Sequence, residues 1–125
     1  MTEKRPVYLN LFKIRLPMTG VVSFAHRVSG FLLFLAIPFA IYLLELSVSS
    51  SSGFSKSLEI LRQPVLKTIV LLLVWALVHH FLAGIRYLLL DLDIGIEKSA
   101  SHLSAWAVLV IEVCIVAVYV WGVML

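Results

Sequence analysis

Three long apolar blocks, separated by short stretches that carry nearly all of the charge, constrain this sequence more than any other feature. The charged side chains are ten Lys or Arg and seven Asp or Glu residues, and all of them except Glu45 and Glu112 lie in residues 1–27, 56–67 and 86–98. The chain is 62% hydrophobic and 14% charged, whereas an ordinary soluble domain is about half apolar and about a quarter charged. The sequence therefore predicts an integral membrane protein.

The apolar blocks predict an all-α membrane protein with a single domain over residues 1–125 and three transmembrane helices. The predicted spans cover about residues 28–48, 68–90 and 103–125. The first contains 21 residues and would extend roughly 31 Å, which matches a hydrocarbon core of about 30 Å. No internal repeat or hinge between domains is visible, so the whole chain reads as one membrane-anchoring unit.

The segments between the spans give secondary expectations. Pro38 lies in the middle of the first span and predicts a kink. Residues 49–53 are expected to form a polar loop, and residues 56–67 a short amphipathic or irregular segment at the membrane surface. Asp91 and Asp93 are expected to cap the loop before the third span.

Basic residues predict how the chain is oriented. Seven Lys or Arg residues lie on the side of the N-terminus and three on the opposite side, which places residues 1–27 in the cytoplasm and the C-terminus in the periplasm. The net charge of +3 thus reflects membrane topology, and no clustered basic face indicates nucleic-acid binding. Arg86 is expected to extend from the end of the second span toward the membrane surface.

A partner subunit is expected because three helices of this length cannot enclose a sizeable pocket alone. The single cysteine, Cys114, excludes a disulfide or a Cys-ligated cluster within this chain. Helices associate in lipid through small residues and polar contacts, and Glu112 is expected to face a partner or to relay protons. The small residues available for close approach are Gly30, Ala76, Ala83, Gly84 and Ser104.

Two of the four histidines lie deep in the second span. His79 and His80 are on the order of 15 Å from its cytoplasmic end, and an ionisable group at that depth is a candidate functional residue. His80 lies on a stripe of small residues, among them Gly84, that would let a flat macrocycle approach the backbone. This pattern suits an axial haem ligand, but it equally suits a histidine that hydrogen-bonds a neighbouring helix. His79 points about 100° away, and we expect it to serve packing.

A second haem ligand is not apparent in this chain. His26 and His102 are predicted near the cytoplasmic surface, roughly 15 Å from the level of His80. On that geometry a partner chain must supply the second ligand. The sequence contains no C-x-x-C-H, which excludes covalent c-type attachment.

Ser23 and Arg27 form a second candidate site. They are four residues apart and share one helical face, so a hydroxyl and a guanidinium can point at one acceptor. A quinone carbonyl would suit, because reduction builds negative charge on its oxygen and a fixed cation stabilises that charge. Arg27 could instead bind a lipid phosphate, a haem propionate, or simply anchor the cytoplasmic side.

These motifs resemble the cytochrome b membrane-anchor subunit of succinate dehydrogenase, respiratory complex II. The N-terminal elements RPVYLNL, IRLP and SFAHRVSG occupy residues 5–11, 14–17 and 23–30. A second signature, HFLAGIR, occupies residues 80–86 and is followed by Asp91. The resemblance covers roughly residues 5–91, and the third span matches only in kind.

The resemblance implies a function for the whole chain. It implies a haem b shared with a second small anchor subunit in the bacterial inner membrane, and a ubiquinone site beside the iron–sulfur subunit, which joins a flavoprotein subunit. His80 would be an axial ligand of the haem iron, Ser23 and Arg27 would bind quinone, and His26 and Arg27 would lie near haem propionates. The chain itself would hold no catalytic residue for succinate.

Two alternatives stay open at this point. The chain could be a haem-free structural anchor or assembly module, whose buried polar residues serve only helix pairing. It could also be the anchor of a fumarate reductase, because the family includes fumarate reductases. One departure from the family also matters: many relatives carry a second histidine after the arginine of the second signature, where this chain has Tyr87.

Overall fold

Helices account for almost the whole of the computed structural model, which describes residues 15–124. The elements are α1 (Met18–Ser49), α2 (Ser51–Arg62), α3 (Pro64–Asp91), α4 (Lys98–Tyr119) and a terminal π-helical turn, η1 (Val120–Met124). The predicted all-α fold is confirmed, and the described residues include no strand. The RPVYLNL element, the start of IRLP at Ile14 and residue 125 lie outside the described residues.

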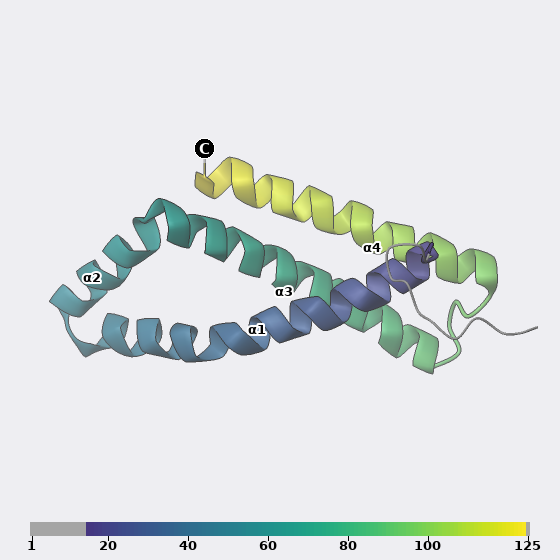
Figure 1. Ribbon diagram of the computed structural model, residues 1–125, viewed down its shortest axis with the longest axis horizontal. Coiled ribbons are helices and arrows are strands. Elements are labelled where there is room, and N and C mark those ends of the chain that lie inside the picture. The colour runs from purple at the N-terminus through teal and green to yellow at the C-terminus, as the bar shows by residue number, and fades with distance from the viewer. Residues whose placement is uncertain (1–14, 125) are drawn as a thin grey trace, which may run out of the picture.

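Three of these helices are long and apolar enough to cross a membrane, as the sequence predicted. They are Met18–Ser49, Pro64–Asp91 and Lys98–Val123. Figure 1 shows that the start of α1, the end of α3 and the start of α4 lie together at one end of the molecule, and that the C-terminus lies toward the other end. The start of α1 and the C-terminus therefore lie at opposite ends of the bundle, as an odd number of spans requires.

Helix α1 begins ten residues before the predicted first span. Its first turn starts directly after Pro17, whose carbonyl accepts hydrogen bonds from the N–H groups of Gly20 and Val21 at 2.8 and 3.1 Å. Hydropathy marks where the apolar run begins, but the helical hydrogen bonds continue through the polar residues that precede it. As a result, His26 and Arg27 lie well inside a helix.

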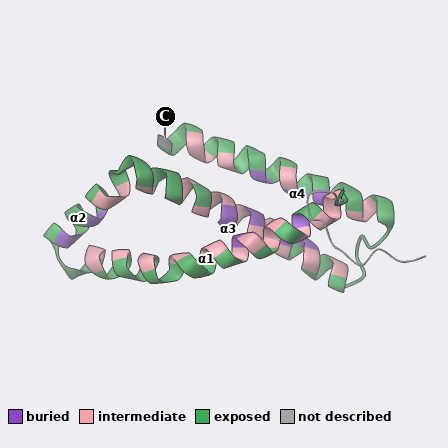
Figure 2. Ribbon diagram, viewed as in Figure 1, coloured by how far each residue is buried: buried purple, intermediate pink, exposed green. Residues whose placement is uncertain are grey.

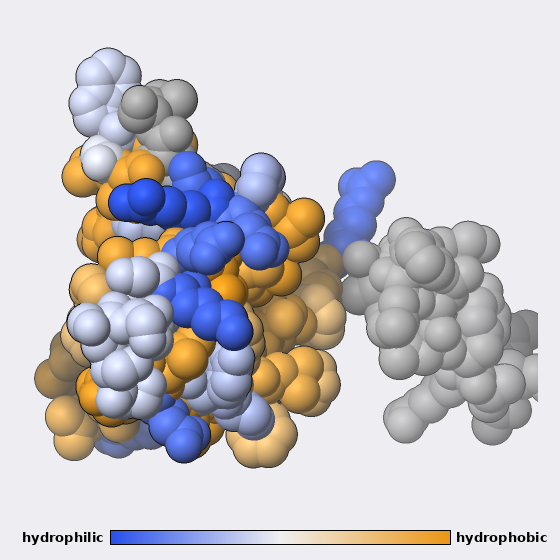
Figure 3. All heavy atoms as spheres, turned by 90° about the vertical axis from the view of Figure 1, so that its left-hand side faces the viewer, coloured by the Kyte–Doolittle hydropathy of each residue, from blue (hydrophilic) through white to orange (hydrophobic). Residues whose placement is uncertain are grey.

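The predicted polar loop over residues 49–53 is wrong, because α2 begins at Ser51 and only Ser50 separates it from α1. The Ser50 hydroxyl accepts a hydrogen bond from the Gly53 N–H at 3.0 Å, which satisfies a free donor at the start of the helix. Of the amphipathic segment predicted over residues 56–67, residues 56–62 lie in α2, whereas residues 64–67 already belong to α3. Figure 3 shows hydrophilic side chains gathered at this end of the molecule, with apolar ones beside them.

The interior is narrow and consists of small residues. Ala76, Ala83 and Ala105 are fully buried, together with Val22 of α1, so the backbones of α1, α3 and α4 can approach closely. Figure 2 shows the buried residues concentrated where α1 crosses α3 and faces α4, with exposed residues over the outer faces. The outer faces carry large apolar side chains such as Phe34 and Phe81, as expected for helices that contact lipid.

Arg86 joins α3 to α4 instead of extending toward the membrane surface, which corrects the prediction for this residue. Only 6% of it is exposed. Its Nε donates to the Ser104 hydroxyl at 3.0 Å, and its Nη2 donates to the Ser101 carbonyl and hydroxyl at 3.1 and 3.0 Å. Ser101 and Ser104, one turn apart on α4, present oxygens on one face that accept from Nε and Nη2 of Arg86.

The connection from α3 to α4 turns sharply at Asp93 and Gly95, which have φ angles of 61° and 75°. Asp tolerates this left-handed conformation better than most residues, and glycine adopts it freely. Asp91 is the last residue of α3. Asp91 and Asp93 were expected to cap this loop. Asp93 instead forms part of the turn through its left-handed backbone conformation.

The tight α1–α2 connection yields a prediction about Gly53. A Cβ at this position would lie 2.3 Å from the Leu46 carbonyl oxygen, so Gly53→Ala forces the backbone to shift and should lower stability by about 1–3 kcal/mol. The measurement is the thermal unfolding midpoint of the assembled protein in mild detergent. Gly122→Ala is the control, because nothing lies within 4 Å of its Cβ position. Equal midpoints for both variants would contradict the prediction.

Candidate functional site

Three histidines meet where α3 crosses α1. His80 is half-buried, and its Nδ1 lies 3.2 Å from the His26 carbonyl oxygen and 3.3 Å from the Ser29 hydroxyl. The Ser29 hydroxyl itself donates to the His26 carbonyl at 2.8 Å. Because a carbonyl can only accept, Nδ1 of His80 carries the hydrogen, and Nε2 of the neutral ring is left with a free lone pair.

This tautomer suits a metal ligand. A ligating histidine typically donates its other ring N–H to a carbonyl or carboxylate, which fixes the ring and raises the basicity of the ligating nitrogen. Among the described residues, Nε2 of His80 makes no hydrogen bond. The lone pair of Nε2 lies in the plane of the ring, so it remains available whatever packs on the faces of the ring.

The residue that lets His80 approach α1 is Gly30. A Cβ built on Gly30 would lie 3.0 Å from Cε1 of His80 and 3.3 Å from its Nδ1. Gly84, which the helical wheel placed on the His80 stripe, faces His26 instead: a Cβ built on Gly84 would lie 3.7 Å from Nε2 of that ring. Both glycines lie at the crossing of the two helices. A Cβ at Gly30 would press on the His80 ring, whereas a Cβ at Gly84 would make an ordinary contact with His26.

The predicted 15 Å separation between His26 and His80 is wrong. Their rings are stacked with centroids 4.2 Å apart and planes 6° from parallel. The depth estimate started the first helix at residue 28, but α1 begins at Met18 and crosses α3 at the level of His26. The Tyr87 ring packs edge-on against His26, with centroids 5.2 Å apart. His26 therefore lies at the level of His80, and depth no longer requires that a partner chain supply the second haem ligand.

Tyr87 adds a second feature that suits a ligand with acceptor oxygens. Its hydroxyl is buried and has no hydrogen-bond partner among the described residues. An unsatisfied buried hydroxyl costs about 1–3 kcal/mol, and an acceptor oxygen from a bound group would remove that cost. The free Nε2 of His80 and the unpartnered hydroxyl of Tyr87 are together compatible with a haem that carries carboxylate groups.

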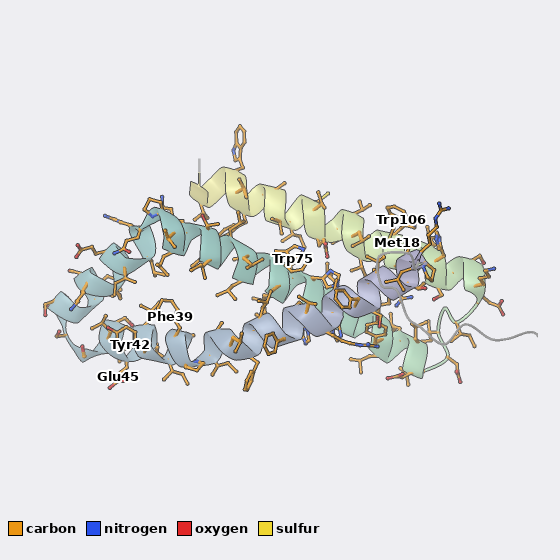
Figure 4. All side chains as sticks on the ribbon, in the orientation of Figure 1. Met18, Phe39, Tyr42, Glu45, Trp75 and Trp106 are labelled. Atoms are coloured by element: carbon orange, nitrogen blue, oxygen red, sulfur yellow. The ribbon has the colours of Figure 1, made fainter. Side chains whose placement is uncertain are left out.

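His79 serves helix packing, as predicted, and its partner is Glu112, which was expected to face a partner chain. His79 is fully buried, pairs with the Glu112 carboxylate through Nδ1 and lies 3.3 Å from the Val22 carbonyl through Nε2. Trp75 Nε1 donates to the other Glu112 oxygen at 3.3 Å, and Figure 4 shows Trp75 between α3 and α4. Glu112 therefore faces the inside of this chain, which corrects the expectation that it faces a partner.

Ser23 and Arg27 share one face of α1, as their spacing predicted. The Nη2 atom of Arg27 donates to the Ser23 hydroxyl at 3.4 Å. The Arg27 side chain is exposed, so most of its donors are free for an acceptor outside the chain. His102, in contrast, lies exposed in the first turns of α4 and makes no polar contact with the other histidines in the described part of the chain.

Sequence reasoning missed Ser29, Trp75 and the hydroxyl of Tyr87. Ser29 lies between Val28 and Gly30 in the SFAHRVSG element, but its partner is on another helix, 51 residues away. Trp75 could have been found through Glu112. A carboxylate inside an apolar block needs a hydrogen-bond donor at the same depth, and Glu112 is such a carboxylate.

The chain is similar to known membrane subunits over nearly its whole length. Residues 1–119 match the family described as succinate dehydrogenase/fumarate reductase transmembrane subunit. The succinate dehydrogenase cytochrome b556 subunit of Coxiella burnetii is 36% identical over 123 residues, covering 97% of this chain and 98% of the relative. The corresponding subunit of Paracoccus denitrificans is 30% identical over 105 residues, covering 84% and 81%.

The close packing of Gly30 against His80 gives a prediction about stability. Gly30→Ala places a methyl group against the imidazole and should destabilise the protein by about 1–3 kcal/mol, seen as a lower unfolding midpoint in mild detergent. Gly84→Ala is the matched control, since its Cβ would make an ordinary contact at 3.7 Å. A larger loss for Gly84→Ala than for Gly30→Ala would refute this reading of the helix crossing.

Proposed function

Because the chain belongs to the succinate dehydrogenase/fumarate reductase transmembrane subunit family, we propose that it is the haem b-binding membrane anchor of a succinate:quinone oxidoreductase. Two features carry this proposal beyond the family: the free Nε2 of the half-buried His80 and the Ser23–Arg27 pair, whose guanidinium is exposed. The chain would contribute no residue to succinate oxidation. It would instead help form the site where electrons from an iron–sulfur subunit reach ubiquinone.

His80 is the proposed axial ligand of the haem iron. Its Nδ1–H is committed to the His26 carbonyl at 3.2 Å, which leaves Nε2 as the coordinating atom. A bound haem b would supply a one-electron carrier at this depth of the membrane. The second axial ligand is proposed to come from a second small anchor subunit. His79 has both nitrogens engaged within the chain, and His26 stacks face to face on His80 with ring centroids 4.2 Å apart, so the two rings cannot point at one iron from opposite sides.

The haem propionates are proposed to lie near His26 and Arg27. These residues are adjacent on α1, His26 contacts the ring of His80, and the Arg27 guanidinium is exposed. Guanidinium–carboxylate hydrogen bonds are among the stronger ones because both groups are charged. The buried Tyr87 hydroxyl near His26 can act as a further donor to the same group of oxygens.

Ser23 and Arg27 are also the proposed quinone-binding residues. Reduction of a quinone places negative charge and then a proton on each carbonyl oxygen, so a hydroxyl and a fixed cation stabilise the reduced state more than the neutral ground state. The hydrogen bond between them at 3.4 Å keeps both donors on one side of α1. Because Ser23 and Arg27 lie near the start of α1, the proposed quinone site would lie toward the end of the molecule that holds the α3–α4 turn.

The proposed orientation places the N-terminus in the cytoplasm and the C-terminus in the periplasm of a bacterial inner membrane. The seven basic residues on the N-terminal side against three on the other side support it. In this orientation the iron–sulfur and flavoprotein subunits would dock at the end where α1 begins. The family description also covers fumarate reductase, and the direction of electron flow with the native quinone distinguishes the two activities.

Replacement of the proposed ligand tests the haem assignment. His80→Ala should abolish the b-type bands in the dithionite-reduced minus oxidised spectrum of the complex purified through a tag on this chain. His102→Ala is the matched control, since that histidine is exposed at the start of α4, and should leave the bands intact. An unchanged spectrum for His80→Ala in an intact complex would remove His80 as a ligand.

Replacement of the exposed cation tests the quinone site. Arg27→Leu should slow succinate-dependent quinone reduction by about 100-fold, the lower end of the effect of removing one preorganised donor. Succinate oxidation with a soluble artificial acceptor should persist. Arg62→Leu, on α2 at the other end of the molecule, should affect neither rate. Equal loss of both activities in Arg27→Leu would indicate an assembly defect and count against a quinone role.

A further inference from the structure

Two consecutive histidines of α3 dock onto the backbone of α1. Nε2 of His79 lies 3.3 Å from the Val22 carbonyl, and Nδ1 of His80 lies 3.2 Å from the His26 carbonyl. Val22 and His26 are one helical turn apart, so the two imidazoles contact backbone carbonyls on successive turns of the same helix. Of these two histidines, only His80 belongs to the proposed haem site.

The hydrogens in the His79 group can be assigned from its partners. The Val22 carbonyl can only accept, so Nε2 of His79 carries a hydrogen. Nδ1 faces the Glu112 carboxyl group, and one further hydrogen lies between these two atoms. The other Glu112 oxygen accepts from Trp75 Nε1 at 3.3 Å. Every polar group of this cluster is thereby satisfied, although His79 is fully buried and Glu112 is only 5% exposed.

The need to hold the helices together does not by itself explain an ionisable cluster between α3 and α4. Apolar residues of similar volume often stabilise a buried site as well as an ion pair does or better, and α3 already packs on its neighbours through Ala76 and Ala83. Directional hydrogen bonds supply something that small apolar contacts cannot, namely a defined rotation of one helix about its axis. His79 is fixed by α4 on one ring nitrogen and by α1 on the other.

The rotation of α3 decides where His80 points. Neighbouring side chains on a helix are held about 100° apart, so fixing His79 also fixes the direction of His80. At a radius of about 6 Å from the helix axis, a rotation of about 10° moves a ring by about 1 Å. A shift of that size would alter the approach of His80 to Gly30 and its hydrogen bond to the His26 carbonyl.

We propose that His79, held by Glu112 and Trp75, is a positioning residue that orients the His80 imidazole. This inference rests on the proposed function, in which His80 binds the haem iron. His79 itself contacts neither haem nor quinone in this arrangement. The polar cluster sets the angle of the ligand ring, and the small residues around it supply the close packing.

The experiment compares two replacements of Glu112 in the complete complex. Glu112→Gln keeps an acceptor for Trp75 Nε1 and offers an N–H to Nδ1 of a neutral His79, so the ligand ring should keep its orientation. Glu112→Leu removes both interactions. Glu45→Leu is the matched control, because Glu45 is an exposed carboxylate of α1 at the end near α2 (Figure 4).

The measured quantities are the reduced α-band and the electron paramagnetic resonance g-values of the oxidised haem, each normalised to the haem present. Glu112→Leu should shift both, whereas Glu112→Gln and Glu45→Leu should match the unaltered complex. A merely structural role would lower the yield of complex without moving these normalised signals. Unshifted signals in Glu112→Leu would overturn the inference.

Two further outcomes are decided in the same series. If Glu112→Leu yields no complex, Trp75→Phe, which removes one N–H donor and retains an aromatic ring, answers the question: a shift supports positioning and no shift overturns it. If the unaltered complex lacks b-type bands, the proposed function fails and this inference fails with it. If those bands are present and only the Glu112→Leu signals stay unshifted, the positioning role alone is wrong.

Discussion

The hydrogen bonds that pass from α3 to the backbone of α1 are the interactions on which the arrangement of the other parts depends. In a membrane interior an unpaired imidazole N–H has no water to bind, so each buried histidine must find an acceptor within protein. The carbonyls of Val22 and His26 meet this need while also belonging to the helical ladder of α1. This requirement sets which faces of the two helices meet, and it brings Gly30 and Gly84 into the crossing.

Polar contacts also attach α4 to α3, here through side chains and not through a backbone carbonyl of α1. Lipid gives no hydrophobic driving force between helices, so close packing and polar contacts must hold them together. Arg86 binds two serines near the start of α4, and the Glu112 carboxylate binds His79 and Trp75 further along it. Between these two polar attachments lie Ala105 and Val108, which are buried against α3.

The sequence predicts the parts of this structure that depend on composition and local spacing. Apolar block length predicts three spanning helices, and a four-residue interval predicts the shared face of Ser23 and Arg27. The contact between His26 and His80 could not be predicted in this way, because it depends on where α1 begins and on how the helices cross. Hydropathy places the start of the span at residue 28, but the helix continues back to Met18.

The same limit explains the errors at Arg86 and Glu112. A charged residue in an apolar helix indicates that a partner exists, but the sequence does not say on which chain or helix that partner lies. Trp75 and the two serines of α4 become visible as partners only once α3 and α4 lie side by side. The different directions of His79 and His80, by contrast, could be predicted from the sequence, because a rotation of about 100° between neighbouring residues is a property of the helix alone.

The length of α1 has a consequence for its position in a bilayer. A helix of 32 residues extends about 48 Å, whereas the hydrocarbon core is about 30 Å thick. Tilt alone would need about 50° to absorb the mismatch, beyond the range of about 0–40° seen for membrane helices. Some turns of α1 therefore project into the headgroup region. If these are the first turns, a lipid-soluble molecule diffusing within the bilayer meets the Ser23 hydroxyl and the Arg27 guanidinium where the hydrocarbon ends, without having to leave the membrane.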